Sequence, residues 1–91
     1  MSVDDQLLFF FLVQWCGEFQ LGVGGTTGCP EVVFSEDQLT EAKSYCDEKN
    51  ECIGVLRHPN GKYTPRCGNM ARMGWAHWLN KRGCLPGNQP P

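Results

Sequence analysis

Six cysteines spread along 91 residues constrain this chain more than any other feature. No two of them are separated by only two residues, whereas zinc ribbons and thioredoxin-like redox sites usually need the C-x-x-C spacing. An even number of cysteines in a short chain favours disulfide bonds, although many complete pairings are open. The cysteines are Cys16, Cys29, Cys46, Cys52, Cys67 and Cys84. Persistent disulfides predict an oxidising compartment, either the extracellular space or a secretory or organelle lumen.

A chain of this length forms one domain with a modest core, which disulfides of roughly 2–4 kcal/mol each can supplement. Before the first cysteine, residues 7–13 are seven consecutive large apolar side chains. The run is too short to cross a bilayer, which takes about 20 apolar residues, so we expect no membrane span. It can form a buried strand or a helix that is apolar all round. Alternate side chains of a strand point to opposite faces, so one core cannot cover them all.

Residues 1–15 are therefore predicted to be a docking segment that contacts a partner, unless they fill the core of the domain itself. The candidate contacts in this segment are Phe9, Phe10, Phe11 and Trp15. At the other end of the chain, residues 85–91 are rich in proline and are expected to form a loose tail.

The charges are divided unevenly along the chain. All ten acidic residues lie between Asp4 and Glu51 with only two lysines, which gives that half a formal charge of −8. From Cys52 onward there are six basic residues and no acidic ones, which gives +6. Either an acidic helix lies against basic strands, or a basic face recognises an acidic protein or a glycan. Nucleic acid is not expected as a partner, because the chain is acidic overall.

The clearest helix begins after Ser35, which can act as a cap while Gln38 closes a capping box. Apolar residues then recur at helical spacing, so we expect an amphipathic helix over about residues 36–49. Residues 52–57 predict a strand, and His58-Pro59-Asn60-Gly61 a hairpin turn into a second strand over residues 62–67.

The other segments are predicted as shorter strands, a turn and a loop. Residues 19–23 and 31–34 flank a glycine-rich segment at 22–28, which favours a flexible turn. Residues 69–74 resemble a loop, and residues 75–79 alternate large and small side chains as a strand does. The predicted fold class is α+β: a small disulfide-rich domain with one amphipathic helix packed on a short antiparallel sheet.

The helix ending in Ala42-Lys43-Ser44-Tyr45-Cys46, followed after five residues by Cys52-Ile53-Gly54-Val55, resembles the PAN/apple family. The resemblance covers about residues 29–84, within a cystine domain that we place at residues 16–84. It implies a Cys46–Cys52 disulfide and a Cys29–Cys84 disulfide tying the ends of the domain together. Cys16 and Cys67 are then left for the third disulfide, because Ala42 stands where many members have a second helix cysteine.

Members of that family are mostly non-catalytic modules, so the resemblance implies binding to a protein or, less specifically, to a carbohydrate. The candidate contacts are Arg57, Tyr63, Arg66, Arg72, Trp75 and Trp78, since aromatic and arginine side chains are effective anchors. The alternative is an accessory subunit of a larger membrane-associated assembly, docked through residues 7–15 and facing an oxidising lumen.

Catalysis is not predicted, and neither a metal nor a cofactor is implied. A nucleophile needs a base within reach and a third group that orients the base. His58 and His77 have no acidic residue after Glu51 close to them in sequence. The expected roles of these histidines are a polar turn residue and a partly buried strand residue.

Overall fold

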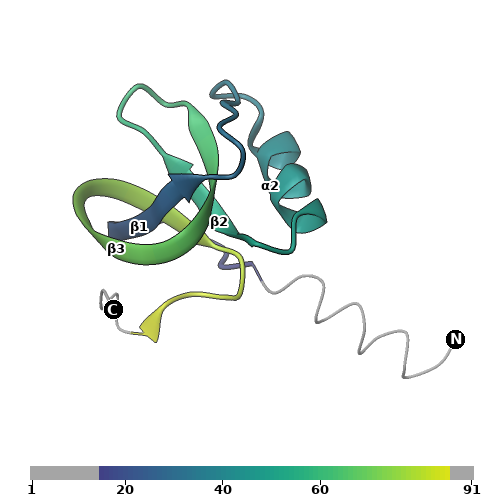
Figure 1. The fold of residues 1–91 in the computed structure, drawn as a ribbon. Coiled ribbons are helices and arrows are strands. Elements are labelled where there is room, and N and C mark those ends of the chain that lie inside the picture. The colour runs from purple at the N-terminus through teal and green to yellow at the C-terminus, as the bar shows by residue number, and fades with distance from the viewer. Residues whose placement is uncertain (1–14, 87–91) are drawn as a thin grey trace, which may run out of the picture.

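The computed structural model describes residues 15–86, in which one helix packs on an antiparallel sheet of three strands. The elements are β1 (Gln20–Gly28), α2 (Leu39–Glu48), β2 (Cys52–Arg57) and β3 (Tyr63–Asn80). In Figure 1, β3 sweeps through a wide curve and α2 covers one side of the curled sheet. The α+β fold class is confirmed. The docking segment up to residue 14 and the tail beyond residue 86 lie outside the described residues.

The two ends of β3 flank β2. The register pairs are Val55 with Pro65 and with Leu79, and Arg57 with Tyr63 and with His77. In both sets the numbers on β3 fall as those on β2 rise, so both pairings run antiparallel. β1 joins the same two stretches of β3, because Gln20 pairs with Trp78 and Gly28 with Arg66. The sheet therefore closes on itself, and the described strands form a small barrel rather than an open layer.

Closure depends on glycines that let neighbouring segments approach closely. A Cβ atom on Gly54 would lie 2.4 Å from the Trp78 ring and 2.5 Å from the Leu79 carbonyl oxygen. On Gly25 it would lie 2.6 Å from Cβ of Arg66. The prediction of a flexible turn over residues 22–28 is therefore wrong, because these glycines make room within β1. The predicted loop at residues 69–74 is wrong for a related reason, since those residues continue β3 around the barrel.

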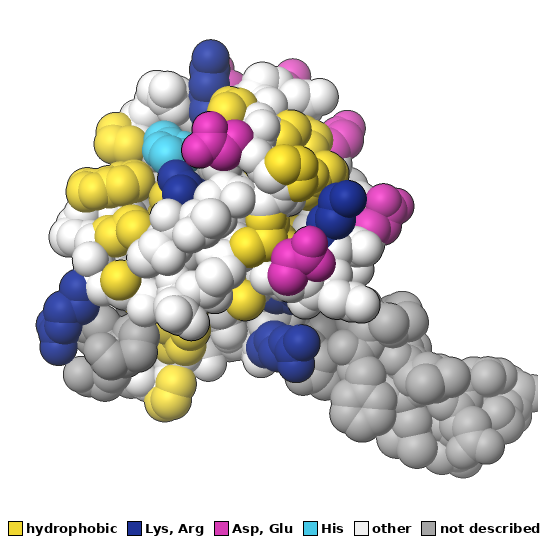
Figure 2. All heavy atoms as spheres, viewed as in Figure 1, with side chains coloured by type: hydrophobic (Ala, Val, Ile, Leu, Met, Phe, Trp, Pro, Cys, Tyr) yellow, Lys and Arg dark blue, Asp and Glu magenta, His cyan; other side chains and the backbone are white. Residues whose placement is uncertain are grey.

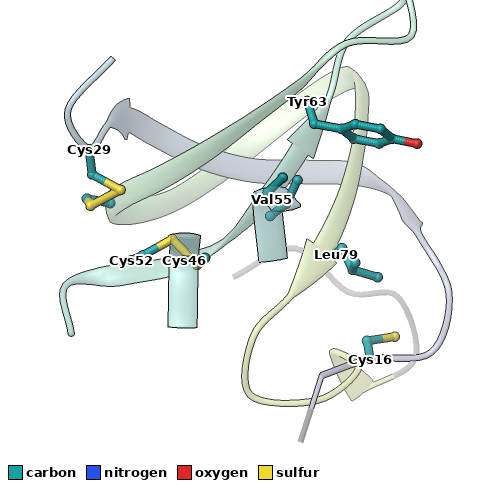
Figure 3. Close-up of a cluster of buried hydrophobic side chains, with 9 residues drawn as sticks. Cys16, Cys29, Cys46, Cys52, Val55, Tyr63 and Leu79 are labelled. Carbon is teal, nitrogen blue, oxygen red and sulfur yellow. A yellow bond between two sulfur atoms is a disulfide. The ribbon is translucent and has the colours of Figure 1, made fainter. Parts of the chain in front are cut away.

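Two clusters of buried side chains result. The inner cluster comprises Val23, Leu56, Ala76 and Trp78, contributed by all three strands. The helix-side cluster comprises Cys16, Cys29, Ala42, Cys46, Cys52, Val55, Tyr63, Cys67 and Leu79. Figure 3 shows most of the helix-side cluster, with the Cys46–Cys52 disulfide joining the helix to the start of β2. β2 separates the two clusters, because consecutive side chains of a strand point to opposite faces.

All six cysteines are paired, as Cys16–Cys84, Cys29–Cys67 and Cys46–Cys52. The expected Cys46–Cys52 disulfide is present, whereas the expected Cys29–Cys84 and Cys16–Cys67 disulfides are wrong. The antiparallel register of β1 on β3 is the reason. The end of β1 lies at the start of β3, where Thr27 pairs with Cys67, so Cys29 meets Cys67.

The beginning of β1 lies at the other end of β3. The backbone N–H of Cys16 donates to the Asn80 carbonyl oxygen at 3.0 Å, which brings Cys16 to Cys84. The ends of the described domain are thus tied by a disulfide, as the resemblance implied, but Cys16 rather than Cys29 makes it.

The helix is shorter than predicted, because it begins at Leu39 instead of residue 36. The Gln38 Oε1 atom accepts from the Ser35 backbone N–H at 3.0 Å, as in a capping box. The single Ser35 hydroxyl proton, however, is shared between Gln38 Oε1 and Asp37 Oδ1, and no described side chain caps the helix backbone. These contacts form a turn before the helix. At the C-terminal end, Lys81 Nζ donates to the carbonyl oxygens of Cys46 and Lys49 at 2.8 and 3.1 Å.

The hairpin between β2 and β3 follows the prediction. The Gly61 N–H donates to the His58 carbonyl oxygen at 2.8 Å, and the His58 N–H donates to that of Lys62 at 2.9 Å. Gly61 has a φ of +90°, the left-handed conformation that the last residue of such a three-residue loop needs. This turn places His58 beside the first residues of β3.

Candidate partner-binding site

A pocket of about 300 Å³ lies between the segment after β1, the hairpin turn and the start of β3. Its lining residues are Gly28, Glu31, Val32, Val33, His58, Asn60, Lys62, Thr64 and Arg66. We call it the basic pocket. One wall, residues 30–33, is held at both ends, by the Cys29–Cys67 disulfide and by paired backbone hydrogen bonds between Phe34 and Tyr63 of 2.8 and 2.9 Å.

His58 forms one side of the basic pocket. Its Nε2 atom lies 2.9 Å from the Thr64 hydroxyl, and its ring stacks on Trp75 with the ring centroids 5.6 Å apart. Burial lowers the pKa of His58 below its usual value, and the positive charge of Arg66 lowers it further. Both causes disfavour the imidazolium form, so the His58 ring stays neutral down to a lower pH than the ring of a free histidine does.

Arg66 forms another part of the lining, and its hydrogen bonding is incomplete. The Nη1 atom donates to the Thr26 carbonyl oxygen at 3.4 Å, a long bond. The Nε atom is buried and has no hydrogen-bond partner among the described residues. An unsatisfied buried N–H group costs about 1–3 kcal/mol, more for a charged group, so this nitrogen destabilises the fold.

The pocket has an excess of positive charge. Lys62 and Arg66 line it together with one carboxylate, that of Glu31, and His58 is biased toward its neutral form. The carboxylate belongs to an exposed residue on the wall. Of the six basic residues in the second half of the chain, Lys62 and Arg66 line this hollow.

Two exposed apolar residues adjoin the pocket. Val33, on its wall, is 62% exposed, and Trp75, stacked on His58, is 48% exposed. Figure 2 shows one face of the domain, on which hydrophobic, basic and acidic side chains surround a histidine. Tryptophan and arginine are enriched at protein-binding surfaces, where they serve as anchors.

A second hollow of about 350 Å³ lies beside α2, where Trp15 enters the described part of the chain. The Trp15 indole N–H donates to Asp47 Oδ1 at 2.9 Å, and the Lys43 ammonium lies 5.4 Å from the ring centroid. Trp15 is half-buried, so the last residue of the predicted docking segment is attached to the helix.

The other predicted contact residues fall into three groups. Trp78 is fully buried in the inner cluster and Tyr63 is buried against Phe19, so proposing these two as surface contacts was wrong. Trp78 is interior because the barrel closes over it, whereas Tyr63 is covered as part of the helix-side cluster. Arg57 is exposed with its guanidinium over the Phe19 ring, and Arg72 is exposed but does not line the pocket.

Phe9, Phe10 and Phe11 lie outside the described residues. The structure thus brings Arg66 and Trp75 together around His58, but not the whole predicted set.

Sequence reasoning missed His58, Thr64, Glu31 and Val33 as pocket residues. Two signals were available for part of this set. Thr64 and Arg66 are two apart on a predicted strand and so share a face. The turn that contains Asn60-Gly61 also places His58, just before residues 59–61, opposite Lys62, just after them. No local signal points to Glu31 or Val33, because their position depends on the closure of the barrel and on the Cys29–Cys67 disulfide.

No protein-family model matches the chain, and no curated protein or solved structure is significantly similar to it. Within residues 15–86, no helix has the length and apolar character needed to cross a membrane. Three disulfides indicate an oxidising environment, secreted or lumenal.

Proposed function

We propose that this protein is a non-catalytic binding module of an oxidising compartment, and that it recognises a protein partner through the face around the basic pocket. The observation that carries the proposal is Trp75, a half-exposed tryptophan held by stacking on a histidine at the edge of a positively charged hollow. A large aromatic side chain kept partly in water forgoes burial energy, and at binding surfaces it serves as an anchor.

The rigidity of this face supports the same function. A disulfide, a pair of backbone hydrogen bonds and a hairpin fix the three sides of the pocket. Preorganised surfaces bind more tightly, because less conformational freedom is lost on association. The PAN/apple resemblance agrees with a binding role, and a glycan remains the alternative ligand class.

The experiment places a photo-crosslinking amino acid at Val33, which is exposed on the pocket wall. The matched control carries it at Glu48, an exposed residue of α2. The intact oxidised protein is irradiated with native secreted or lumenal proteins of its source. We expect a discrete crosslinked species from position 33 and none of the same mass from position 48.

Trp75→Ala should weaken that partner's affinity by about 30-fold, the effect of losing a hot-spot tryptophan worth about 2 kcal/mol. Equal crosslinking from positions 33 and 48, or an unchanged affinity after Trp75→Ala, would contradict the proposal. Binding to a glycan array with no protein crosslink would transfer the role to carbohydrate recognition.

A second candidate is an accessory subunit of a larger membrane-associated assembly, docked through residues 7–15. The observation in its favour is Trp15, whose indole is fixed on α2 by Asp47 and Lys43. This attachment would set the direction in which the docking segment leaves the domain. Deleting residues 1–14 distinguishes the candidates, because the accessory subunit would lose its partners while the binding module would keep them.

A further inference from the structure

We propose that the basic pocket receives a carboxylate of the protein partner, with Arg66 as its receptor. This inference rests on the proposed function and specifies the chemistry that the site recognises. The carboxylate can come from an aspartate or glutamate side chain or from the C-terminus of the partner chain, and the experiment below separates these sources.

The hydrogen bonding of the Arg66 guanidinium is incomplete, and its buried Nε edge must turn toward the pocket to meet a ligand. Its Nη1 atom already donates to the Thr26 carbonyl oxygen, and its Nε–H has no acceptor among the described residues. In a planar guanidinium, Nε–H and one Nη2 N–H lie on the same edge and match the two oxygens of a carboxylate. A bound carboxylate would therefore supply the acceptor that the unbound domain lacks.

The surroundings favour an anion over a neutral group. Lys62 adds a second positive charge, and the Thr64 hydroxyl lies 2.9 Å from His58 Nε2, so these neighbours are polar and close. The valines at positions 32 and 33 form the apolar part of the lining. A charged hydrogen bond beside an apolar wall is screened less by water than one on an open surface.

The size of the pocket suits one small group. Its volume of about 300 Å³ is near the lower limit for small-molecule sites, so it can hold a side chain or a chain end rather than a folded surface. Val33 and Trp75 would then contact the partner around that group.

Glu31 provides an internal check on the proposal. Its carboxylate belongs to the pocket lining and repels an incoming anion. Glu31→Gln removes that repulsion and keeps the size of the side chain, so it should tighten binding by about two- to fivefold, as expected for a partly screened like-charge contact. Among the described residues, Glu31 is the one acidic residue that lines the pocket, so neutralising any other charged side chain there should not raise the affinity for an anion.

The experiment follows the Arg66 Nε–H signal by NMR while acetylated hexapeptides of glycine and alanine are added. One peptide has a free C-terminal carboxylate, a second is amidated and carries one glutamate, and a third is amidated and carries glutamine instead. A glucuronic-acid oligosaccharide serves as the carbohydrate probe. The protein is the intact oxidised chain.

We expect the Nε–H signal to shift with one or both carboxylate peptides and not with the glutamine peptide. A response to the first peptide alone assigns the pocket to a chain end, and a response to the second alone assigns it to a side chain. Arg66→Met, which keeps the aliphatic stem, has no Nε–H, so its peptide affinity is followed at the backbone amide signals of the pocket residues and should fall about tenfold or more. Arg72→Met is the matched control, an exposed arginine of β3 outside the pocket, and should leave binding unchanged.

Four outcomes would overturn the proposal: no shift with either carboxylate peptide, an equal shift with the glutamine peptide, full binding by Arg66→Met, or a response to the oligosaccharide alone. Because Arg66→Met also removes an unsatisfied buried N–H, it should not lower the stability of the domain. If Trp75→Ala weakens partner binding while Arg66→Met leaves it unchanged, the carboxylate receptor is wrong and the proposed function stands.

Discussion

The inner cluster and the helix-side cluster stabilise the same strand by different physical means. The inner cluster contains no cysteine, and its largest member, Trp78, fits against glycines of β1 and β2. The helix-side cluster contains five of the six cysteines and only three larger apolar side chains. The inner cluster is held by the complementary shape of its side chains, and the helix-side cluster by disulfides that reduce the conformational entropy of the unfolded chain.

This difference has a consequence for mutations. The inner cluster should be sensitive to any change of volume, because it is held by close packing and none of its side chains is covalently linked. The helix-side cluster should tolerate small changes of volume but be sensitive to loss of its disulfides. The predictions below test that contrast, beginning with the largest expected effect.

Trp78→Ala should destabilise the domain by about 5 kcal/mol, the upper end of the range for large aromatic residues in cores. Trp78 is fully buried, and the strands on either side of it are tied to one another, so the cavity cannot collapse. Its indole N–H also donates to Asn80 Oδ1 at 3.1 Å, a bond that would be lost. Denaturant unfolding of the oxidised protein measures the effect.

The matched control for this prediction is Trp75→Ala, because Trp75 is half exposed and stacks only on His58 in the described structure. Its loss of stability should be well below that of Trp78→Ala. Equal losses for the two variants would show that the inner cluster is not held by shape.

Removing disulfides should destabilise the helix-side cluster according to the length of chain that each one closes. The Cys29–Cys67 disulfide closes 38 residues and Cys46–Cys52 closes six. The chain-entropy relation then gives about 4 kcal/mol for the first and about 2 kcal/mol for the second. Paired substitutions, Cys29→Ala with Cys67→Ala and Cys46→Ala with Cys52→Ala, test this order by urea unfolding. The reverse order would mean that packing of α2, not chain entropy, dominates.

The same contrast explains which parts of the fold could be predicted from the sequence. The Cys46–Cys52 disulfide joins residues six apart across a predicted helix end and strand start, so its partners are determined locally. The helix, the first strand of the hairpin and the turn before Lys62 are local features as well. In each case neighbouring residues in the sequence determine the conformation.

Barrel closure could not be predicted in that way. Gly24 and Gly25 resemble turn residues unless it is known that Leu56 and Arg66 lie against them. The other two disulfides depend on the register of β1 on β3, which is set between residues about 40 to 60 apart in sequence. The candidate site has the same origin: Arg66 and Trp75 were predicted as contacts, but the pocket wall at Glu31 and Val33 exists only because the barrel closes.

Lys81→Met should destabilise the domain by about 1 kcal/mol, since it removes hydrogen bonds to two carbonyl oxygens at the C-terminal end of α2. Burial lowers the pKa of Lys81, and the nearby Asp47 carboxylate opposes that shift. The ammonium is therefore partly desolvated but is stabilised by a nearby negative charge. Arg82→Met is the control, because Arg82 is exposed on the same turn. Urea unfolding at neutral pH measures both variants, and a loss no larger than that of the control would contradict this role.

The smallest expected effect is a dependence of stability on pH that originates at the pocket. Among residues 15–86, neither buried cluster contains a histidine, a lysine or a carboxylate. His58 has a pKa lowered by burial and by Arg66, so the unfolded chain binds its proton more readily than the folded domain. Stability should therefore fall as the pH decreases through the unfolded value of about 6.5 toward the lower folded value, and rise again with pH over that window.

The comparison of wild type with His58→Gln isolates this contribution from that of the other titrating groups. The melting temperature of the wild type should fall more between pH 7 and pH 5 than that of His58→Gln, by a margin smaller than the effect of Lys81→Met. Arg66→Met provides the second check, because removing its charge should raise the pKa of His58 measured by NMR titration. If the stability of His58→Gln has the same dependence on pH as that of the wild type, burial at the pocket does not shift the pKa of His58. If Arg66→Met leaves the His58 pKa unchanged, the positive charge of Arg66 does not act on His58 across the hollow.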